Sequence, residues 1–271
     1  MSEGITENRA KLDGSADTVK QVFNSRTLES SHRILSDLLE RGQSVLDAGC
    51  GTGAITYGIA QKVGESGCVI GIDNNEDLVL YARETFGDLS ALNFEVADIR
   101  TLPYCGEFDV VTSARVLQWL ATPEDAIAQM INAVKSGGRV VVLDYNHNKV
   151  SWKPDVPPSM KTFYQAFLRW RLDAGMNNAI ADELSLLFAN KGLIDIKATE
   201  QHETISRGEP SFQEQITIWA EVAATRGVQM VADGYLTEHE RITAENEYRE
   251  WAQTKAESQT MYMLAVEGTK P

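Results

Sequence analysis

The first half of the chain alternates short apolar runs with longer segments of helical periodicity. The apolar runs occupy residues 44–49, 68–73, 92–98, 108–113 and 139–145. Apolar residues recur with helical spacing between them, at 54–64, 76–87 and 123–138. Because strands that alternate with helices form mostly parallel sheets, this pattern predicts an α/β fold built from βα units.

The pattern changes on both sides of this region. Residues 15–40 are predicted to be helical before the first strand. After Tyr145 a loop is predicted at 146–160, followed by helices at 161–175 and 179–192. A strand is then expected at 193–200, a polar helical segment at 210–256 and a last strand at 261–268. The helical segments that do not belong to βα units are expected to form a lid over the sheet.

Composition and charge narrow the class of protein. The chain has 271 residues and no apolar run near the roughly 18 residues of a membrane span. Its start lacks the apolar segment of a signal peptide, so a cytoplasmic protein is expected. With 39 acidic residues against 25 Lys and Arg, the net charge of -14 disfavours nucleic acid as a partner. The three cysteines form no disulfide or zinc pattern, and no metal site is predicted.

A glycine-rich loop follows the first predicted strand, in VLDAGCGTGAIT at 45–56. Gly49, Gly51 and Gly53 leave room for a tight turn and for a ligand close to the backbone. Asp47 precedes this loop at the strand end, where an acid suits a ligand that carries positive charge. Cys50 is either a small buried residue or a nucleophile, and the first reading is favoured.

Two further acids end the next strands. Asp73 lies about 20 residues after Gly53, the spacing at which an acid meets a ribose diol, and Asn74 follows it directly. Asp98 ends the third strand, where it can accept a hydrogen bond from an adenine amine while Ile99 packs on the ring. These acids otherwise act as helix caps or turn residues, but together they predict a nucleoside site.

The sequence resembles the class I S-adenosylmethionine-dependent methyltransferases, in particular the small-molecule branch similar to the ubiquinone and menaquinone biosynthesis methyltransferases. The resemblance rests on VLDAGCGTG, VIGIDNNEDLV, EVADIRTLPY, FDVVTSARVLQWL and GGRVVVLDY, at 45–53, 69–79, 95–104, 108–120 and 137–145. It implies a Rossmann-like, seven-stranded, mostly parallel sheet with helices on both faces. The last strand would be antiparallel and lie between the fifth and sixth.

The resemblance also implies how the cofactor S-adenosylmethionine is held. The glycine loop and Asp47 would surround its methionine part, Asp73 its ribose hydroxyls, and Asp98 with Ile99 its adenine. Main-chain carbonyls near Ser113 and Ala114 would meet its amino group. Arg26 is a candidate partner for its carboxylate, and a solvated helix arginine is the alternative.

The acceptor pocket is expected just beyond the fourth and fifth strands, because ligands of open parallel sheets bind at the carboxyl ends of the strands. The predicted wall consists of the residues just after these strands: Arg115, Gln118, Trp119, Tyr145, Asn146 and His147. His147 is the candidate base for an acceptor proton, and an exposed loop histidine is its alternative. Trp152 and Tyr164 belong to an aromatic segment that either lines the acceptor site or packs as a buried stripe.

The sequence therefore predicts one methyltransferase domain at 1–271. A helical arm is expected at 1–40 and a cofactor-binding core at 41–150. Two lid segments are expected at 151–177 and 205–258, and the antiparallel strand at 259–271. The expected reaction is methyl transfer to an O, N or C atom of a small, neutral or weakly basic molecule. An NAD-dependent oxidoreductase and a non-catalytic cofactor-binding module are the alternatives, and the oligomeric state stays open.

Overall fold

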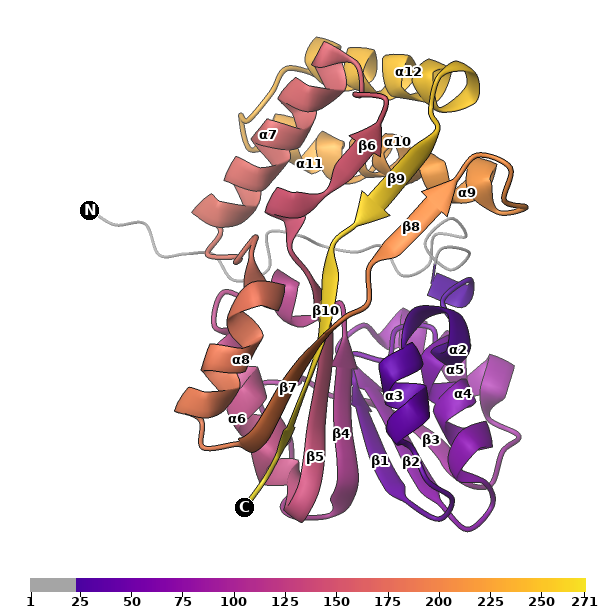
Figure 1. The fold of residues 1–271 in the computed structure, drawn as a ribbon, viewed down its shortest axis with the longest axis vertical. Coiled ribbons are helices and arrows are strands. Elements are labelled where there is room, and N and C mark those ends of the chain that lie inside the picture. The colour runs from indigo at the N-terminus through magenta and orange to yellow at the C-terminus, as the bar shows by residue number, and fades with distance from the viewer. Residues whose placement is uncertain (1–22) are drawn as a thin grey trace.

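The structure is a computed structural model that describes residues 23–271. It consists of a sheet with helices on both faces and a lid stacked on one end of that sheet (Figure 1). The part of the predicted N-terminal arm before residue 23 lies outside the described residues. From residue 28 onward the arm forms two short helices, α2 (Leu28–Ser31) and α3 (Arg33–Leu38).

The described residues form a seven-stranded sheet in the order β3-β2-β1-β4-β5-β10-β7. In that order the strands are Leu92–Val96, Cys68–Asp73, Ser44–Ala48, Phe108–Ala114, Val134–Tyr145, Met263–Thr269 and Ile194–Glu200. Strand β10 runs antiparallel to both of its neighbours, β5 and β7. The predicted fold class is confirmed, including the last strand placed between the fifth and sixth strands of the main sheet.

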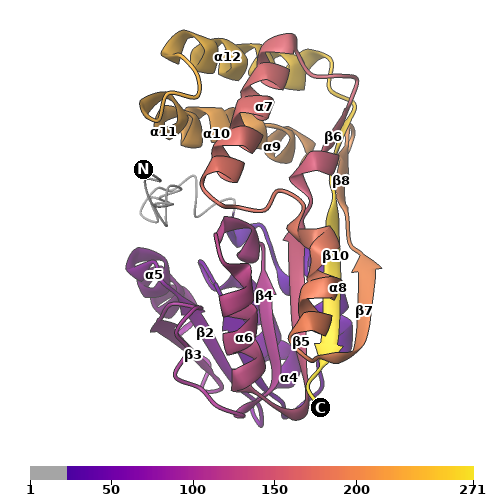
Figure 2. The ribbon, with the colours of Figure 1, turned by 90° about the vertical axis from the view of Figure 1, so that its left-hand side faces the viewer.

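Helices cover both faces of the sheet (Figure 2). One face packs against α2, α3, α4 (Ala54–Val63) and α5 (Glu76–Phe86), and the other against α6 (Pro123–Ala133) and α8 (Ile180–Asn190). Because both faces are covered, the central strands are apolar along most of their length, as in β4 and the second half of β5. Helix α6 ends five residues earlier than predicted, since Val134 already pairs with Phe108 of β4.

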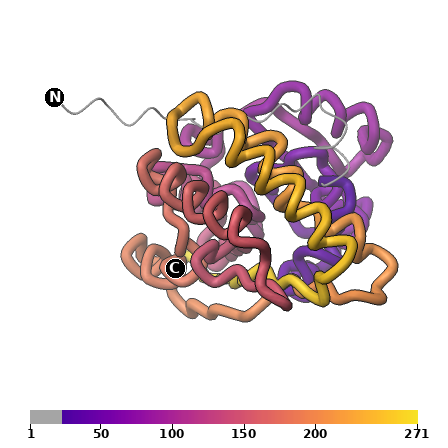
Figure 3. The backbone as a smooth tube through the Cα atoms, turned by 90° about the horizontal axis from the view of Figure 1, so that it is seen from above, coloured from indigo at the N-terminus to yellow at the C-terminus, as the bar shows by residue number. Residues whose placement is uncertain are grey.

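The lid has its own small hydrophobic core. Its helices are α7 (Pro158–Asp173), α9 (Phe212–Ile216), α10 (Ile218–Ala224), α11 (Arg226–Ala232) and α12 (Glu238–Thr254). Helices α7 and α12 pack against each other and cross the top of the molecule (Figure 3). In the part of the chain that the structure describes, no helix has the length and apolar character needed to cross a membrane.

A three-stranded antiparallel sheet joins the lid to the main sheet. Its order is β6-β9-β8, at Ser151–Lys153, Ser258–Met261 and Glu203–Ser206. This order repeats that of β5, β10 and β7, the strands with which these three are nearly continuous along the chain. Only Tyr262 separates β9 from β10. The lid therefore stands on strands that continue out of the main sheet (Figure 1).

The prediction of a purely helical lid missed these three strands. Each is three or four residues long, and most of their side chains are polar and partly exposed. Such segments carry no periodic pattern, and their strand conformation depends on pairing with segments about 50 to 100 residues away.

Candidate active site

A cavity of about 660 Å³ lies between the carboxyl ends of the parallel strands and the lid. We call its wall at the ends of β1 to β4 the cofactor half, and it includes Phe23, Arg26, Gly49, Cys50, Gly51, Asp73, Asn74, Leu78, Asp98, Ile99 and Ala114. We call the opposite wall the lid half, which includes Phe167, Met176, Ile218, Trp219, Glu221, Val222, Thr225, Arg226 and Met261. Between the two halves lie side chains in and around η1 (Leu117–Trp119), together with Tyr145 at the end of β5 and His147 at the start of η2 (His147–Lys149). Those in and around η1 are Arg115, Val116, Gln118, Trp119 and Leu120.

The glycine loop turns where side chains have no room. Gly49, Gly51 and Gly53 all have positive φ angles, of 90°, 54° and 83°, which favour glycine. A Cβ atom on Gly49 would lie 2.2 Å from Val116 Cγ2, and one on Gly53 would lie 2.7 Å from Phe94 Cζ. The loop therefore needs glycine both for its backbone angles and for close packing.

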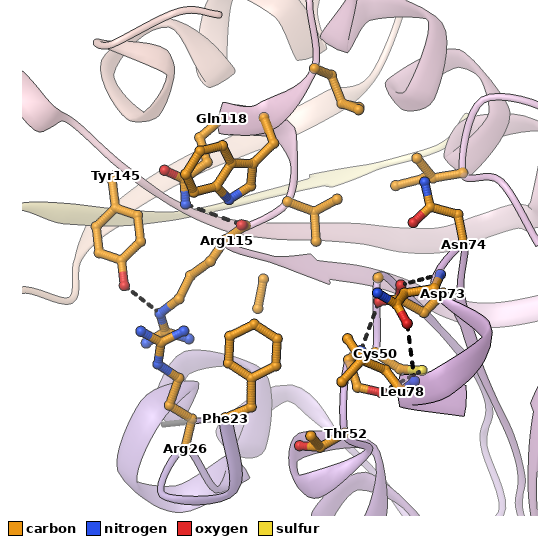
Figure 4. Close-up of a pocket in the computed structure, with 18 of the residues that line it drawn as sticks. Phe23, Arg26, Cys50, Thr52, Asp73, Asn74, Leu78, Arg115, Gln118 and Tyr145 are labelled. Carbon is orange, nitrogen blue, oxygen red and sulfur yellow. Dashed lines mark hydrogen bonds between the residues drawn. The ribbon is translucent and has the colours of Figure 1, made fainter. Parts of the chain in front are cut away.

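Asp73 joins the end of β2 to the glycine loop. Its carboxylate accepts hydrogen bonds from the backbone N–H groups of Gly51 and Asn75, both at 2.9 Å. Burial raises the pKa of Asp73 above its ordinary value, although these N–H donors act in the opposite direction. Asp73, Asn74 and Cys50 lie close together at one end of the cavity (Figure 4).

Asp47 lies behind the cavity wall. It is 2% exposed and accepts a hydrogen bond of 2.7 Å from the Thr56 hydroxyl at the start of α4. Burial raises its pKa to about 6, and the nearby Asp73 adds to this shift. This hydrogen bond joins β1 to α4 next to the glycine loop. Asp47 itself does not border the cavity.

Asp98 and Ile99 border the cofactor half after β3. Arg100 donates from both Nε and Nη2 to Asp98, at distances between 2.7 and 3.2 Å, and this contact lowers the pKa of Asp98. Ile99 is 7% exposed and also belongs to the hydrophobic core on the face of the sheet that α6 and α8 cover. This edge of the cavity combines a carboxylate fixed in position with an apolar surface.

Arg115 connects three parts of the molecule at the end of β4. Its φ angle is 64°, a left-handed conformation that is strained for a residue with a Cβ atom and often occurs at functional sites. The buried guanidinium donates to the Tyr145 hydroxyl, to the carbonyl of Ser31 and to the carboxylate of Glu203 in β8. Figure 4 shows Arg115, Tyr145 and Gln118 grouped at the end of the cavity opposite Asp73.

His147 is buried, so the exposed loop alternative is wrong. It is 4% exposed, and its Nε2 lies 2.6 Å from Oε1 of Gln118. Its backbone N–H donates to Asn178, and its carbonyl accepts from the Tyr164 hydroxyl. Burial lowers the pKa of His147 well below its usual value, and Arg171 adds to this shift. The ring is therefore a neutral imidazole near pH 7.

The lid half is mainly apolar and aromatic. Phe167 and Trp219 meet edge to face with ring centroids 5.5 Å apart, and both also belong to the core of the lid. Arg226 is the cation of this wall, and its guanidinium carbon lies 5.4 Å from the centroid of the Trp119 ring. Burial lowers the pKa of Arg226 to about 10, which leaves it charged at neutral pH.

Most of the predicted site residues border the cavity: Arg26, Gly49, Cys50, Gly51, Asp73, Asn74, Asp98, Ile99, Ala114, Gln118, Trp119, Tyr145 and His147. Asp47, Gly53 and Ser113 lie behind its wall, where the Ser113 hydroxyl donates to the Ala48 carbonyl. Whether these residues bind a cofactor or an acceptor stays a prediction.

Trp152 and Tyr164 do not border the cavity, which corrects their expected place in its wall. They pack edge to face with centroids 5.1 Å apart, and Trp152 donates to Gln259 of β9. The physical reason is that Trp152 pairs with Gln259 of β9 in the small sheet, which places its ring against the hydrophobic core of the lid. Trp152 and Tyr164 therefore follow the buried-stripe alternative, whereas Phe167 of the same segment borders the cavity.

Sequence reasoning missed the part of the lid half that comes from α10 and α11. Ile218, Glu221, Val222 and Thr225 follow the i, i+3, i+4, i+7 pattern of one helix face, which is the signal that could have found them. That signal is ambiguous, because the same spacing describes any helix that packs on a core. Within residues 23–271, no group of three or more His, Cys, Asp or Glu is placed to hold a metal ion.

Comparison with known proteins identifies a family. The sequence profile described as a methyltransferase domain matches residues 39–192, more than half of the chain. An uncharacterized 37.1 kDa protein in transposon TN4556 of Streptomyces fradiae is 37% identical over 125 residues, 45% of this chain and 36% of that protein. The ubiquinone/menaquinone biosynthesis C-methyltransferase UbiE of Erwinia tasmaniensis is 30% identical over 173 residues, 56% of this chain and 66% of UbiE.

A solved structure shows the same fold. Phosphoethanolamine N-methyltransferase 2 of Haemonchus contortus, in complex with phosphomonomethylethanolamine and S-adenosylhomocysteine, has a TM-score of 0.59 and 16% identity. The alignment covers 94% of this chain and 57% of that one. The matches thus span about a third to two thirds of the length of the curated relatives. On its sequence profile, its sheet order and its glycine loop, the chain belongs to the class I S-adenosylmethionine-dependent methyltransferase family.

Proposed function

We propose that this chain transfers a methyl group from S-adenosylmethionine to an O, N or C atom of a small molecule held against the lid half. One observation carries the proposal. A single cavity runs from the glycine loop and Asp73 to the aromatic wall of the lid, so a donor and an acceptor can lie end to end. Such a site places the methyl group between the two halves, near residues 115–120.

The cofactor half fits this donor. Gly49 and Gly51 border the cavity without side chains, so a ligand can lie close to the backbone there. We assign Asp73 to the ribose hydroxyls, Asp98 with Ile99 to the adenine, and Arg26 to the methionine carboxylate. When bound, S-adenosylmethionine supplies an electrophilic methyl group on a sulfonium sulfur.

The lid half points to an acceptor with an aromatic or apolar body. Phe167, Trp219 and Ile218 supply flat and apolar surface, while Arg226 brings positive charge to the same wall. The charge of the neighbouring Arg115 is paired with the carboxylate of Glu203. Glu221 also lies there, and it forms an ion pair with Arg249 at 3.0 Å. This arrangement favours an acceptor that is electron-rich or weakly acidic, in place of the neutral or weakly basic molecule expected from sequence.

The chain contributes alignment, exclusion of water and one candidate base. Methyl transfer is an in-line displacement, so holding donor and acceptor in register supplies much of the acceleration. The lid, fixed by strands β6, β8 and β9, limits access of water to the reacting atoms. His147 is neutral and lies in the wall between the halves, where it can take a proton from the acceptor.

The relatives support the reaction class and leave the acceptor atom open. UbiE is a C-methyltransferase of ubiquinone/menaquinone biosynthesis, and the Haemonchus contortus enzyme is an N-methyltransferase. The Haemonchus contortus structure holds phosphomonomethylethanolamine, which is far smaller than a protein or a nucleic acid. We therefore propose a small-molecule acceptor here, with segments 151–177 and 205–258 serving as the lid.

Titration calorimetry tests the cofactor assignment. We expect S-adenosylhomocysteine to bind and NADH not to bind. Binding of NADH without S-adenosylhomocysteine would overturn the proposal in favour of an oxidoreductase. Turnover is then measured with S-adenosylmethionine labelled in its methyl group, against a panel of hydroxyaromatic and enolic metabolites, with mass spectrometry of the products. Tight cofactor binding with no labelled product from any metabolite extract would favour a non-catalytic module.

A further inference from the structure

Arg226 reaches from the lid to the wall between the two halves of the cavity. It begins α11, and its guanidinium carbon lies 5.4 Å from the centroid of the Trp119 ring in η1. Both residues border the cavity, and both keep part of their surface exposed. The guanidinium therefore lies at the cavity wall, beside an aromatic ring that a bound molecule can also contact.

A second guanidinium contacts the same ring from inside the protein. The guanidinium carbon of Arg171 lies 4.7 Å from the Trp119 centroid, and Arg171 itself is fully buried. Its hydrogen bonds go to the side-chain oxygen of Asn178 and to the backbone carbonyl of Gln118. Both of these acceptors are uncharged, so neither neutralises the positive charge of Arg171.

The two guanidinium groups repel each other next to Trp119. Burial lowers the pKa of Arg171 to about 10, Asp144 opposes this shift, and the charge of Arg226 adds to it. Burial also raises the pKa of Asp144 to about 7, so Asp144 carries only part of a negative charge at neutral pH. A negative group on a molecule bound beside Trp119 would be attracted to both arginines.

Three acids border the cavity within residues 23–271, and each has its own partners. Asp73 and Asp98 belong to the cofactor half, where backbone N–H groups hold the first and Arg100 holds the second. Glu221 belongs to the lid half and pairs with Arg249 at 3.0 Å. Because Glu221 lies in the same wall as Arg226, this wall suits a single negative charge better than the double charge of a phosphate ester.

We propose that Arg226 is a specificity-determining residue that binds a carboxylate group of the methyl acceptor beside Trp119. The inference rests on the proposed function and narrows its substrate class to small acids with an aromatic or apolar body. A planar guanidinium can donate two parallel hydrogen bonds to one carboxylate. The rings of Phe167 and Trp219 offer contacts to the rest of the acceptor. Arg171 adds to the attraction through its charge, without touching the acceptor.

Binding of matched acids and amides tests this inference. The full chain, labelled with ¹⁵N and saturated with S-adenosylhomocysteine, is titrated with a panel of aromatic and aliphatic carboxylates and with the primary amide of each. The amide keeps the shape of the acid and removes its charge. The indole N–H signal of Trp119, identified by its loss in Trp119→Phe, reports binding beside that ring. The signal of Trp251, which lies in the lid core, is the internal control.

Carboxylates should shift the Trp119 signal and bind at least about tenfold more tightly than their amides, as expected for hydrogen bonds between charged groups. The Trp251 signal should stay in place. Three outcomes would overturn the inference. They are equal affinities for acids and amides, tighter binding of the amides, and a Trp119 signal that no acid in the panel shifts.

Two variants of Arg226 and one matched control test the residue itself. Arg226→Gln should remove the preference for acids, whereas Arg226→Lys should keep most of it because it keeps the charge. Arg169→Gln is the control, since Arg169 is exposed, lies 5.6 Å from the Tyr235 ring centroid and does not border the cavity. All three variants should bind S-adenosylhomocysteine like the wild type. A preference that persists in Arg226→Gln, or that Arg226→Lys loses to the same extent, would remove Arg226 from this role.

The two proposals fail in different experiments. If S-adenosylhomocysteine does not bind, the proposed function is wrong. If it binds and the acids bind no better than their amides, only the role of Arg226 is wrong. A labelled product that forms faster from amides than from the matching acids would also contradict the inference, while leaving methyl transfer intact.

Discussion

The cofactor half and the lid half face each other across Arg115 and Gln118, and they are built by different means. Most of the cofactor half consists of loops that follow β1 to β4, and strand pairing sets the spacing of those loops. Phe23 and Arg26 join it from the segment before β1, and Leu78 joins it from α5. The lid half combines side chains from α7, α10, α11 and β9, which lie far apart in sequence. Phe167 and Trp219 belong both to its wall and to the lid core.

This difference predicts separate consequences of substitution. In the cofactor half, backbone groups and a few carboxylates are the proposed binding groups, so changes there should affect affinity more than stability. In the lid half, the same side chains form the wall and the core, so changes there should affect stability first. Four substitutions test this difference between the two halves.

The largest effect is expected for Phe167→Ala in the lid. Phe167 is 2% exposed, and removing a buried Phe ring costs about 3 to 5 kcal/mol of unfolding free energy. Chemical denaturation measures this loss, and the affinity for S-adenosylhomocysteine should stay within about twofold. Leu172→Ala on the same helix is the control, since Leu172 is 64% exposed and its change should stay within about 0.5 kcal/mol. A matching loss of cofactor affinity in the folded Phe167 variant would show that the two halves are not separable.

Asp73→Ala should have the next largest effect, on binding. It removes a carboxylate that faces the cavity and also orders the glycine loop through Gly51. We expect the affinity for S-adenosylhomocysteine to fall by about 1.5 to 3 kcal/mol, the range for hydrogen bonds to a charged group. Calorimetry checks this, with exposed Asp88→Ala as the matched acidic control. Unchanged affinity would mean that the ribose is held elsewhere.

Asp47→Asn should change how stability depends on pH. Because the folded chain raises the Asp47 pKa to about 6, it binds that proton more tightly than the unfolded chain does. The contribution of this group to stability is therefore full below about pH 4 and is lost as the pH rises towards 6. Asn keeps an oxygen for Thr56 and carries no charge. The variant should exceed the wild type by on the order of 2 kcal/mol at pH 7, with the difference closing near pH 4.

Denaturant titrations of both proteins between pH 4 and pH 8 measure this effect. A difference that is the same at every pH would show that Asp47 titrates normally in the folded chain. A wild type that gains stability over the variant as the pH rises would reverse the sign and point to a cationic partner for Asp47.

Cys50→Ala should have the smallest effect. Cys50 is 9% exposed, and burial raises the pKa of its thiol well above the usual value, so it is a thiol and not a nucleophilic thiolate at neutral pH. We expect cofactor affinity to change by less than about twofold. Alkylation with iodoacetamide should reach the exposed Cys68 and Cys105 first. Early modification of Cys50, located by peptide mass mapping, would contradict this view.

Sequence patterns predict the main sheet well because its strands are buried on both faces. The boundaries of β2 match the predicted run, and the boundaries of β1 and β4 differ from their predicted runs by one residue. Parallel strands of this kind are continuous apolar runs that end in Gly or Asp, a signal that does not depend on distant partners. The same signal located Gly49, Asp73 and Asp98 at the edge where the cavity lies.

The strands and the wall residues of the lid could not be predicted as well as the main sheet, because they depend on contacts between segments that lie far apart in sequence. The pairing of β6 with β9 places Trp152 against the lid core, and no local sequence pattern indicates this pairing. Arg226 lies in a polar segment that reads as a solvated face, yet it borders the cavity beside Trp119. His147 is recognisable as a residue just past a strand, whereas its burial and its contact with Gln118 require the folded chain.

The sequence alone pointed to the family and to most residues of the cofactor half, because both depend on short motifs with fixed local geometry. The strand order followed from the resemblance to that family. The tertiary structure decided the rest. It assembled the lid half from α7, α10, α11 and β9, and it placed Arg115 where β4, β5 and β8 meet. It also paired His147 with Gln118 across 29 residues of chain. The physical reason is that long-range packing and buried hydrogen bonds have no counterpart in local periodicity.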